Sequence, residues 1–132
     1  LELEESIAHG FGCSPRLLVE QRVRCREVTV GVIERFRGRD IYTLLPSGSP
    51  LRRDESRALQ EAAARIHRGL GLRHYSNTDF LVTPRGIFVL EVNTLPGFGY
   101  RSHLPRALDE IGCSYSDFLA HLISLAQSEQ RV

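Results

Sequence analysis

Alternating apolar and polar positions are clearest in the run EVTVGVIE, residues 27–34. Three valines at even positions fall on one face, while Thr29, Gly31 and Ile33 fall on the other. This period of two is typical of a β-strand. Similar reasoning predicts a strand over 16–23 (RLLVEQRV) and another over residues 40–45. Two further apolar runs, before and after a Thr-Pro-Arg-Gly sequence, predict a hairpin.

Helical spacing of apolar residues follows the loop sequence PSGSP and predicts a helix over residues 54–70, capped by Asp54 or Ser49. Shorter helices are predicted over residues 4–12 and from Ser102 to Gly112. A last helix is predicted with Ser114 and Asp117 at its start. Hairpins beside helices indicate an α+β fold with a mainly antiparallel sheet flanked by helices. The apolar residues expected to form the helical stripes are Leu59, Ala62, Ala63, Ile66, Leu70, Phe118, Leu119, Leu122, Ile123 and Ala126.

The hairpin places two acids against each other. Pro84 suits the first corner of a type I turn and Gly86 the left-handed position of a three-residue loop. With that loop Thr83 faces Ile87, and Asp79 lies directly opposite Glu91. Like charges directly opposed on neighbouring strands are destabilising, so a cation between them is expected.

Asn93 lies two residues after Glu91 and therefore points to the same face. Asp79, Glu91 and Asn93 offer oxygen donors, which suits Mg²⁺ or Mn²⁺. The simpler alternative is a solvated polar face. The opposite face is expected to be core, formed by Phe80, Val82, Phe88, Leu90 and Val92.

The composition of the chain limits which classes of protein it can belong to. The 132 residues carry 42% hydrophobic and 25% charged residues and a net charge of +1, which suits one globular domain and argues against a nucleic-acid binder. No apolar run is long enough to cross a membrane, and no signal peptide or CxxC pair is present. We therefore expect a cytoplasmic protein. All 17 basic residues are Arg and Met is absent, which predicts a piece of a longer chain.

The sequence TDF, followed by EVNTLPGF and S-x-x-P, resembles the D-alanine–D-alanine ligases of the ATP-grasp superfamily. The resemblance extends over most of the chain and implies an ATP-grasp C-terminal subdomain over residues 1–132, with the N-terminal and central subdomains absent. It implies an ATP- and Mg²⁺-dependent carboxylate–amine ligase that forms an acyl phosphate in peptidoglycan precursor synthesis.

Residue by residue, the resemblance implies that Asp79, Glu91 and Asn93 hold two Mg²⁺ (or Mn²⁺) ions, with Glu91 bridging them. It assigns adenine contacts to Glu20, Gln21 and Val23, a ribose contact to Glu27, and a position under the purine to Leu90. The alternative for these residues is ordinary solvated strand or core packing. ATP and D-alanine are the implied ligands, and a homodimer is compatible with the resemblance; no nucleic acid or membrane partner is expected.

The resemblance also assigns residues to the second substrate. Gly97 matches the position whose backbone N–H holds the developing oxyanion, and Ser102 matches the hydroxyl that contacts the substrate carboxylate. A helix N-cap is the alternative for Ser102, and the two roles are compatible.

The chain departs from the family at the site. Asn77 occupies the catalytic position at which the family has an arginine that stabilises the transferring phosphate. Residues 46–53 replace a longer loop that covers the site. These departures leave two other interpretations open: a module that binds nucleotide or a partner without turnover, and a purely structural domain. We expect no turnover from these 132 residues alone.

Overall fold

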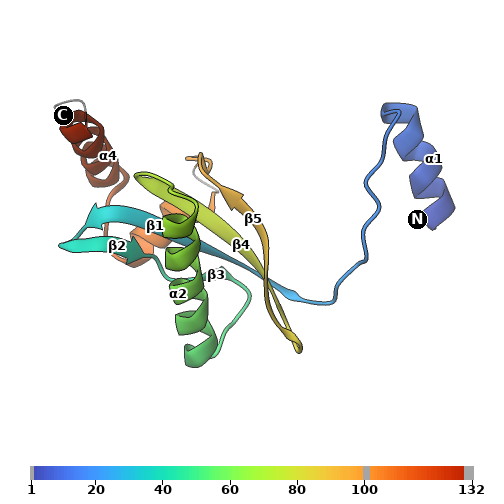
Figure 1. The fold of residues 1–132 in the computed structure, drawn as a ribbon, viewed down its shortest axis with the longest axis horizontal. Coiled ribbons are helices and arrows are strands. Elements are labelled where there is room, and N and C mark those ends of the chain that lie inside the picture. Colours follow the sequence, from blue (N-terminus) through green and yellow to red (C-terminus); the bar gives the residue numbers. More distant parts are fainter. Residues whose placement is uncertain (1, 100–101, 130–132) are drawn as a thin grey trace.

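An antiparallel sheet in which five strands take part forms the middle of the molecule (Figure 1). The structure is a computed structural model, and it describes residues 2–99 and 102–129. Four strands lie in the order β2–β1–β4–β5, and the short β3 pairs with β1 beside β2. Every strand pair is antiparallel, as the sequence predicts. The bounds are β1 Arg26–Phe36, β2 Arg39–Thr43, β3 Ser47–Gly48, β4 Tyr75–Thr83 and β5 Gly86–Asn93.

Helices cover both faces of this sheet, so the α+β prediction is confirmed. The helix α2 packs on one face, and α3 and α4 pack on the other. Their bounds are α1 Leu3–Cys13, α2 Arg53–Gly69, α3 His103–Glu110 and α4 Tyr115–Glu129. Each agrees closely with a helix predicted from the sequence. The predicted strands over 27–34 and 40–45 are likewise confirmed by β1 and β2.

The two faces of β1 enter two separate cores. Its three even-numbered valines pack with Phe80 of β4 and Leu59 of α2. Ile33, on the other face, packs with Leu104 of α3 and Phe118 of α4. Burying a side chain of this size contributes about 1.5–3 kcal/mol, so β1 links the helices on both sides into one fold.

The helix caps are only partly as predicted. Ser114 accepts a hydrogen bond from the Asp117 backbone N–H at 3.1 Å, which confirms the predicted cap of α4. The predicted cap of α2 is wrong. Arg52 is the N-cap residue, and its backbone N–H donates to the Glu55 carboxylate at 2.9 Å. A carboxylate three residues into the helix therefore accepts the backbone N–H of the N-cap residue, and neither Asp54 nor Ser49 is the N-cap.

The predicted strand over residues 16–23 is wrong. These residues form part of an extended connection that leads away from the sheet to α1 (Figure 1). Leu18 is 83% exposed, and α1 buries none of its side chains. A strand needs a hydrogen-bonded neighbour, and the described part of the chain offers none at this place.

The hairpin of β4 and β5 differs from the prediction in two details. Thr83 pairs with Gly86, so the loop has two residues instead of three. The register then shifts between Asp79 and Phe80, which leaves Leu90 as an extra residue on β5. The loop error and the bulge each move the register by one residue, in opposite directions. Asp79 therefore does lie opposite Glu91.

The predicted core face of the hairpin is confirmed on β4, while on β5 it is wrong at Phe88 and Leu90; Val92 is half-buried and pairs with the buried Thr78. Phe80 and Val82 are buried, whereas Phe88 is 51% and Leu90 58% exposed. Phe88 pairs with Leu81 and thus shares the face that carries Asp79. On α4, Phe118 is buried as predicted but Ile123 is exposed. None of the helices in the described residues is long and apolar enough to span a membrane.

Candidate active site

Polar side chains meet on the α3 side of the sheet. Thr29 of β1 pairs with Asp79 of β4, and Asp79 pairs in turn with Glu91 of β5. One step further along, Asn77 pairs with Asn93. Paired residues on neighbouring strands share a face, so the three strands bring these five side chains together.

Asp79 is held by a hydrogen bond and is half-buried. The Thr29 hydroxyl donates to Asp79 Oδ1 at 2.5 Å. Glu91, by contrast, is exposed at the edge strand. Asn93 is also exposed, and its Oδ1 accepts the backbone N–H of Leu95 at 2.9 Å, which fixes the turn that follows β5.

The oxygen donors at this place suit a hard divalent cation. Within the described residues no group of three or more His, Cys, Asp or Glu side chains could hold a metal ion. Asp79, Glu91 and Asn93 supply two carboxylates and one amide instead. Mg²⁺ commonly takes one or two carboxylates and fills its other positions with water and substrate phosphates, so this donor set fits such an ion.

A pocket of about 300 Å³ borders Asp79 and brings together residues from distant parts of the chain. Glu27 and Leu90, both predicted nucleotide contacts, line it beside Asp79. Residues 47–49, His103 of α3, and three residues of β1 and β4 complete the lining, namely Val28, Thr29 and Phe80. A pocket lined by the carboxylates of Asp79 and Glu27 and by apolar side chains can accept a ligand that carries both a charged and an apolar part.

The three other predicted adenine contacts are spread out. Gln21 and Val23 line a separate cavity of about 690 Å³ near the hairpin tip, together with Leu81 and Phe88. Glu20 is exposed and lines neither of these two cavities. The structure therefore brings Gln21 and Val23 to the site's face of the hairpin, and it leaves Glu20 apart from them.

Ser102 and Gly97 lie close together at the start of α3. Ser102 is the N-cap residue of α3, but its side chain makes no capping hydrogen bond. A Cβ placed on Gly97 would lie 3.2 Å from the Ser102 Oγ, so glycine allows this close approach. The N-cap position predicted for Ser102 is confirmed, and its hydroxyl is not used in capping.

Asn77 is only 8% exposed, and its Oδ1 has no hydrogen-bond partner. That oxygen lies 3.3 Å from the point where a Cβ of Gly31 would sit, and Leu44 Cδ1 lies 2.7 Å from the same point. A Cβ at residue 31 would therefore clash with the buried Leu44 side chain. Asn77 thus lies against the backbone of β1 and brings no charge to the site.

Three residues of this region were not predicted: Thr29, Ser47 and His103. The Ser47 hydroxyl and His103 Nδ1 are 3.2 Å apart, and the Ser47 hydroxyl also donates to the Thr29 carbonyl at 3.5 Å. Nothing in the local sequence marks Ser47 or His103. Thr29 could have been found only from the register of β1 on β4, because its partner is 50 residues away.

Comparison with known proteins identifies the class to which this fold and site belong. Residues 48–124 match the family described as the D-ala D-ala ligase C-terminus. This match covers more than half of the chain, so the chain belongs to the D-alanine–D-alanine ligase family and represents its C-terminal region.

Individual relatives agree with this assignment. The D-alanine–D-alanine ligase of Maridesulfovibrio salexigens is 31% identical over 150 residues, which cover 98% of this chain and 50% of the relative. The crystal structure of D-alanyl-alanine synthetase A from Vibrio cholerae has 30% identity and a TM-score of 0.71, and the match covers 91% of this chain and 43% of that one. A Bacillus anthracis D-alanine–D-alanine ligase complexed with ATP shares the fold, with a TM-score of 0.69 at 24% identity over 85% of this chain and 40% of that one.

The chain spans about half the length of these relatives, or less. The alignment with the Maridesulfovibrio ligase is itself longer than the 132 residues of the chain, so the relative has residues there that this chain lacks.

Proposed function

We propose that this chain is the C-terminal nucleotide- and magnesium-binding part of an ATP-dependent ligase of the D-alanine–D-alanine type. One observation carries the proposal: Asp79 and Glu91 lie directly opposite each other beside a pocket that Glu27 and Leu90 also line, in a chain of this family. The implied reaction belongs to peptidoglycan precursor synthesis in the cytoplasm.

Asp79, Glu91 and Asn93 would hold Mg²⁺ together with the phosphates of ATP. The ion supplies positive charge that stabilises the transferring phosphoryl group. The carboxylates on this chain fix where that charge lies, and Leu90 offers an apolar surface to the purine. Glu27 can accept hydrogen bonds from ribose hydroxyls, and Gln21 and Val23 would contact the adenine from the extended segment.

Ser102 and Gly97 would serve the second substrate. The Ser102 hydroxyl makes no capping hydrogen bond and can donate to a carboxylate. The Gly97 backbone N–H can donate to the oxyanion that forms when an amine attacks the acyl phosphate. The attack forms the C–N bond and the oxyanion, and collapse of the oxyanion breaks the C–O bond to phosphate. Phosphate leaves, and the nitrogen loses a proton to the leaving phosphate or to water. D-alanine is the substrate that the family resemblance supports.

A second function is favoured by Asn77. Its amide is uncharged and packs against β1, so it cannot replace an arginine at the transferring phosphate. A module that binds nucleotide without turnover is therefore the alternative. The chain spans half the length of its relatives or less, and we expect no ligase turnover from these 132 residues under either alternative.

Calorimetry with MgATP tests the proposal. We expect the wild-type chain to bind MgATP, and Asp79→Ala and Glu91→Ala each to weaken binding by roughly tenfold or more, because each removes a ligand to the ion. Asp40→Ala is the control, since Asp40 is exposed on β2, away from the pocket. Unchanged binding in both site variants would place the site elsewhere, and formation of D-alanyl-D-alanine by this chain alone would contradict the expected lack of turnover.

A further inference from the structure

We propose that Thr29 is a positioning residue for the metal ligand Asp79, a role that rests on the proposed function. The two residues are direct neighbours in the antiparallel pairing of β1 and β4. The Thr29 hydroxyl donates to Asp79 Oδ1 at 2.5 Å, a short distance that is typical of a hydrogen bond to a charged acceptor.

The hydrogen bond from Thr29 offsets the repulsion between two opposed carboxylates. Asp79 has Glu91 as its direct partner on the other side, so two like charges face each other across β4 and β5. The hydrogen bond from the Thr29 hydroxyl stabilises the Asp79 carboxylate from the β1 side and fixes the direction of its side chain.

The same hydrogen bond leaves the carboxylate open to a cation. The Thr29 hydroxyl reaches Asp79 through Oδ1, one of the two carboxylate oxygens. This contact leaves the second carboxylate oxygen, Oδ2, for a cation, and Thr29 and Asp79 both line the pocket of about 300 Å³. A ligand held through one oxygen by a neighbouring donor, with its other oxygen toward the ion, is a recurrent arrangement around metals.

Thr29 is itself fixed on both sides, which makes it a suitable donor. It pairs with Asp79 on one side and with Ser47 of β3 on the other. Its carbonyl accepts the Ser47 hydroxyl at 3.5 Å. A β-branched side chain has restricted rotation about χ1, so its hydroxyl has a defined direction. The short loop that carries Ser47 thus supports the donor to the metal ligand.

The test measures the affinity of Mn²⁺ alone, from the electron paramagnetic resonance signal of free Mn²⁺ and the broadening of amide signals in β4 and β5. Thr29→Val removes the hydroxyl and keeps the branched shape. It should weaken Mn²⁺ binding by about tenfold to a hundredfold, as loss of outer-shell partners does in metal sites. Thr29→Ser keeps the donor and should bind close to wild type.

Thr78→Val is the matched control. Thr78 precedes Asp79 and is fully buried toward the α2 side of the sheet, and its hydroxyl has no hydrogen-bond partner. The same Thr-to-Val change there should leave Mn²⁺ affinity unchanged. Denaturant unfolding of each variant shows that the fold is intact. If Thr29→Val does not fold, Thr29→Ala takes its place in the comparison with Thr29→Ser.

The outcomes separate this role from the proposed function. If wild-type chain binds Mn²⁺ and Thr29→Val binds it equally well, the positioning role is overturned and the metal site remains. Equal losses of Mn²⁺ affinity in Thr29→Val and Thr29→Ser also overturn the positioning role, because they show that the shape of the side chain matters and the hydroxyl does not. A wild-type chain that binds no Mn²⁺ rejects the metal site and the role of Thr29 with it.

Discussion

At the scale of single residues, a buried histidine of α2, His67, contacts a buried polar side chain of β4. Ser76 is buried, and its hydroxyl lies 2.8 Å from Nδ1 of the equally buried His67 of α2. His67 Nε2 has no hydrogen-bond partner and lies 3.7 Å from a Glu34 oxygen. Burial lowers the pKa of His67 below its usual value, and the nearby Glu34 only partly opposes that effect.

The lowered pKa of His67 predicts a pH-dependent stability. Below about pH 6.5 the unfolded chain takes up a proton at this residue while the folded chain resists it, so the free energy of unfolding should fall as the pH falls. Above that pH the contribution is fully present. Urea unfolding at pH 7.5 and 5.5 measures the effect, and His67→Gln should reduce the difference between the two values.

His103→Gln is the control for this measurement, because His103 is exposed and should leave the pH dependence as in wild type. If His67→Gln shows the same loss of stability between pH 7.5 and 5.5 as the wild type, His67 is not the residue responsible.

At the scale of elements, the first turn of α2 is attached to the start of β1 by one ion pair. The Arg26 guanidinium donates to both oxygens of Glu55, at 3.2 and 2.5 Å, and to the Pro50 carbonyl at 2.8 Å. The hydrogen bonds from Arg26, followed by that from the Arg52 backbone N–H, lower the pKa of Glu55 to about 2. The pair therefore closes the short loop between β3 and α2 against the sheet.

This lowered pKa predicts a second pH effect in a different range. The stability contributed by Glu55 should be fully present above about pH 4.5 and be lost as the pH falls from 4.5 toward 2, because the unfolded chain protonates first. Glu55→Gln should be less stable than wild type at pH 6, with a difference that shrinks at pH 4 and further at pH 3, measured by chemical unfolding.

Glu61→Gln is the matched control on the same helix. Glu61 pairs with Arg57 one turn earlier, and both side chains are largely exposed, so this change should have little effect at any pH. A gap between wild type and Glu55→Gln that does not shrink toward pH 3 would show that the carboxylate charge is not the cause.

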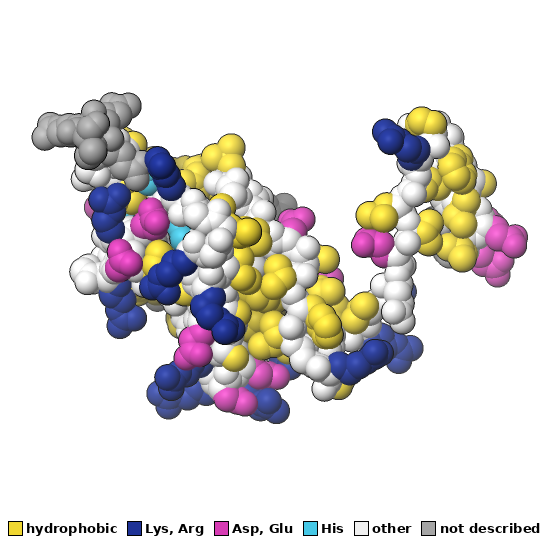
Figure 2. Space-filling model, in the orientation of Figure 1, with side chains coloured by type: hydrophobic (Ala, Val, Ile, Leu, Met, Phe, Trp, Pro, Cys, Tyr) yellow, Lys and Arg dark blue, Asp and Glu magenta, His cyan; other side chains and the backbone are white. Residues whose placement is uncertain are grey.

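At the scale of the whole molecule, apolar surface is left uncovered in two places. The edge strand β5 exposes Ile87, Phe88, Val89 and Leu90. The segment before β1 exposes Leu18 and Val19, and α1 stands apart from the sheet (Figures 1 and 2). Exposed apolar surface of this extent commonly marks an interface. The family resemblance predicts that other subdomains of the same enzyme dock there, and this stays a prediction.

The separate position of α1 predicts how the isolated chain is cleaved. Trypsin should cut first after Arg16, Arg22 or Arg24 in the extended segment, since its backbone is accessible. The product that begins near Cys25 should melt close to the intact chain, because α1 buries no side chain. Mass spectrometry and thermal unfolding check both statements.

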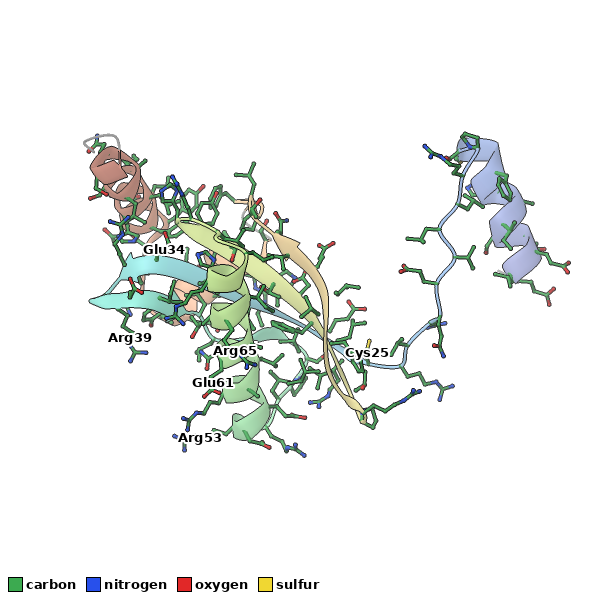
Figure 3. All side chains as sticks on the ribbon, in the orientation of Figure 1. Cys25, Glu34, Arg39, Arg53, Glu61 and Arg65 are labelled. Atoms are coloured by element: carbon green, nitrogen blue, oxygen red, sulfur yellow. The ribbon has the colours of Figure 1, made fainter. Side chains whose placement is uncertain are left out.

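Arginines within α2, among them Arg53 and Arg65 (Figure 3), provide the internal comparison, because a helix must open before a protease can cut it. Early cleavage in α2, or a product that melts well below the intact chain, would show that residues 2–25 contribute to the fold of the rest.

The order and type of most elements could be predicted from the sequence, because apolar periodicity reports local geometry. This applies to β1, β2, α2 and the two C-terminal helices. The prediction failed for residues 16–23, where an apolar run looks like a strand. Periodicity cannot show whether a neighbouring strand is present to accept its hydrogen bonds.

Only part of the candidate site could be predicted from the sequence. Asp79 opposite Glu91 follows from counting along one hairpin, and the count came out right because the shorter loop and the bulge at Leu90 cancel. The exposure of Phe88 and Leu90 could not be found this way, since the bulge changes which residues share a face.

By itself, the sequence determined the family motif, the type of each element and the three oxygen donors of the hairpin, all of which lie within short stretches of chain. Only the tertiary structure decided that Thr29 holds Asp79, that Ser47 meets His103, and that Asn77 packs beside Gly31. These contacts join residues about 50 positions apart. They depend on how β1 pairs with β4 and how α3 packs on the sheet, and no local pattern encodes either.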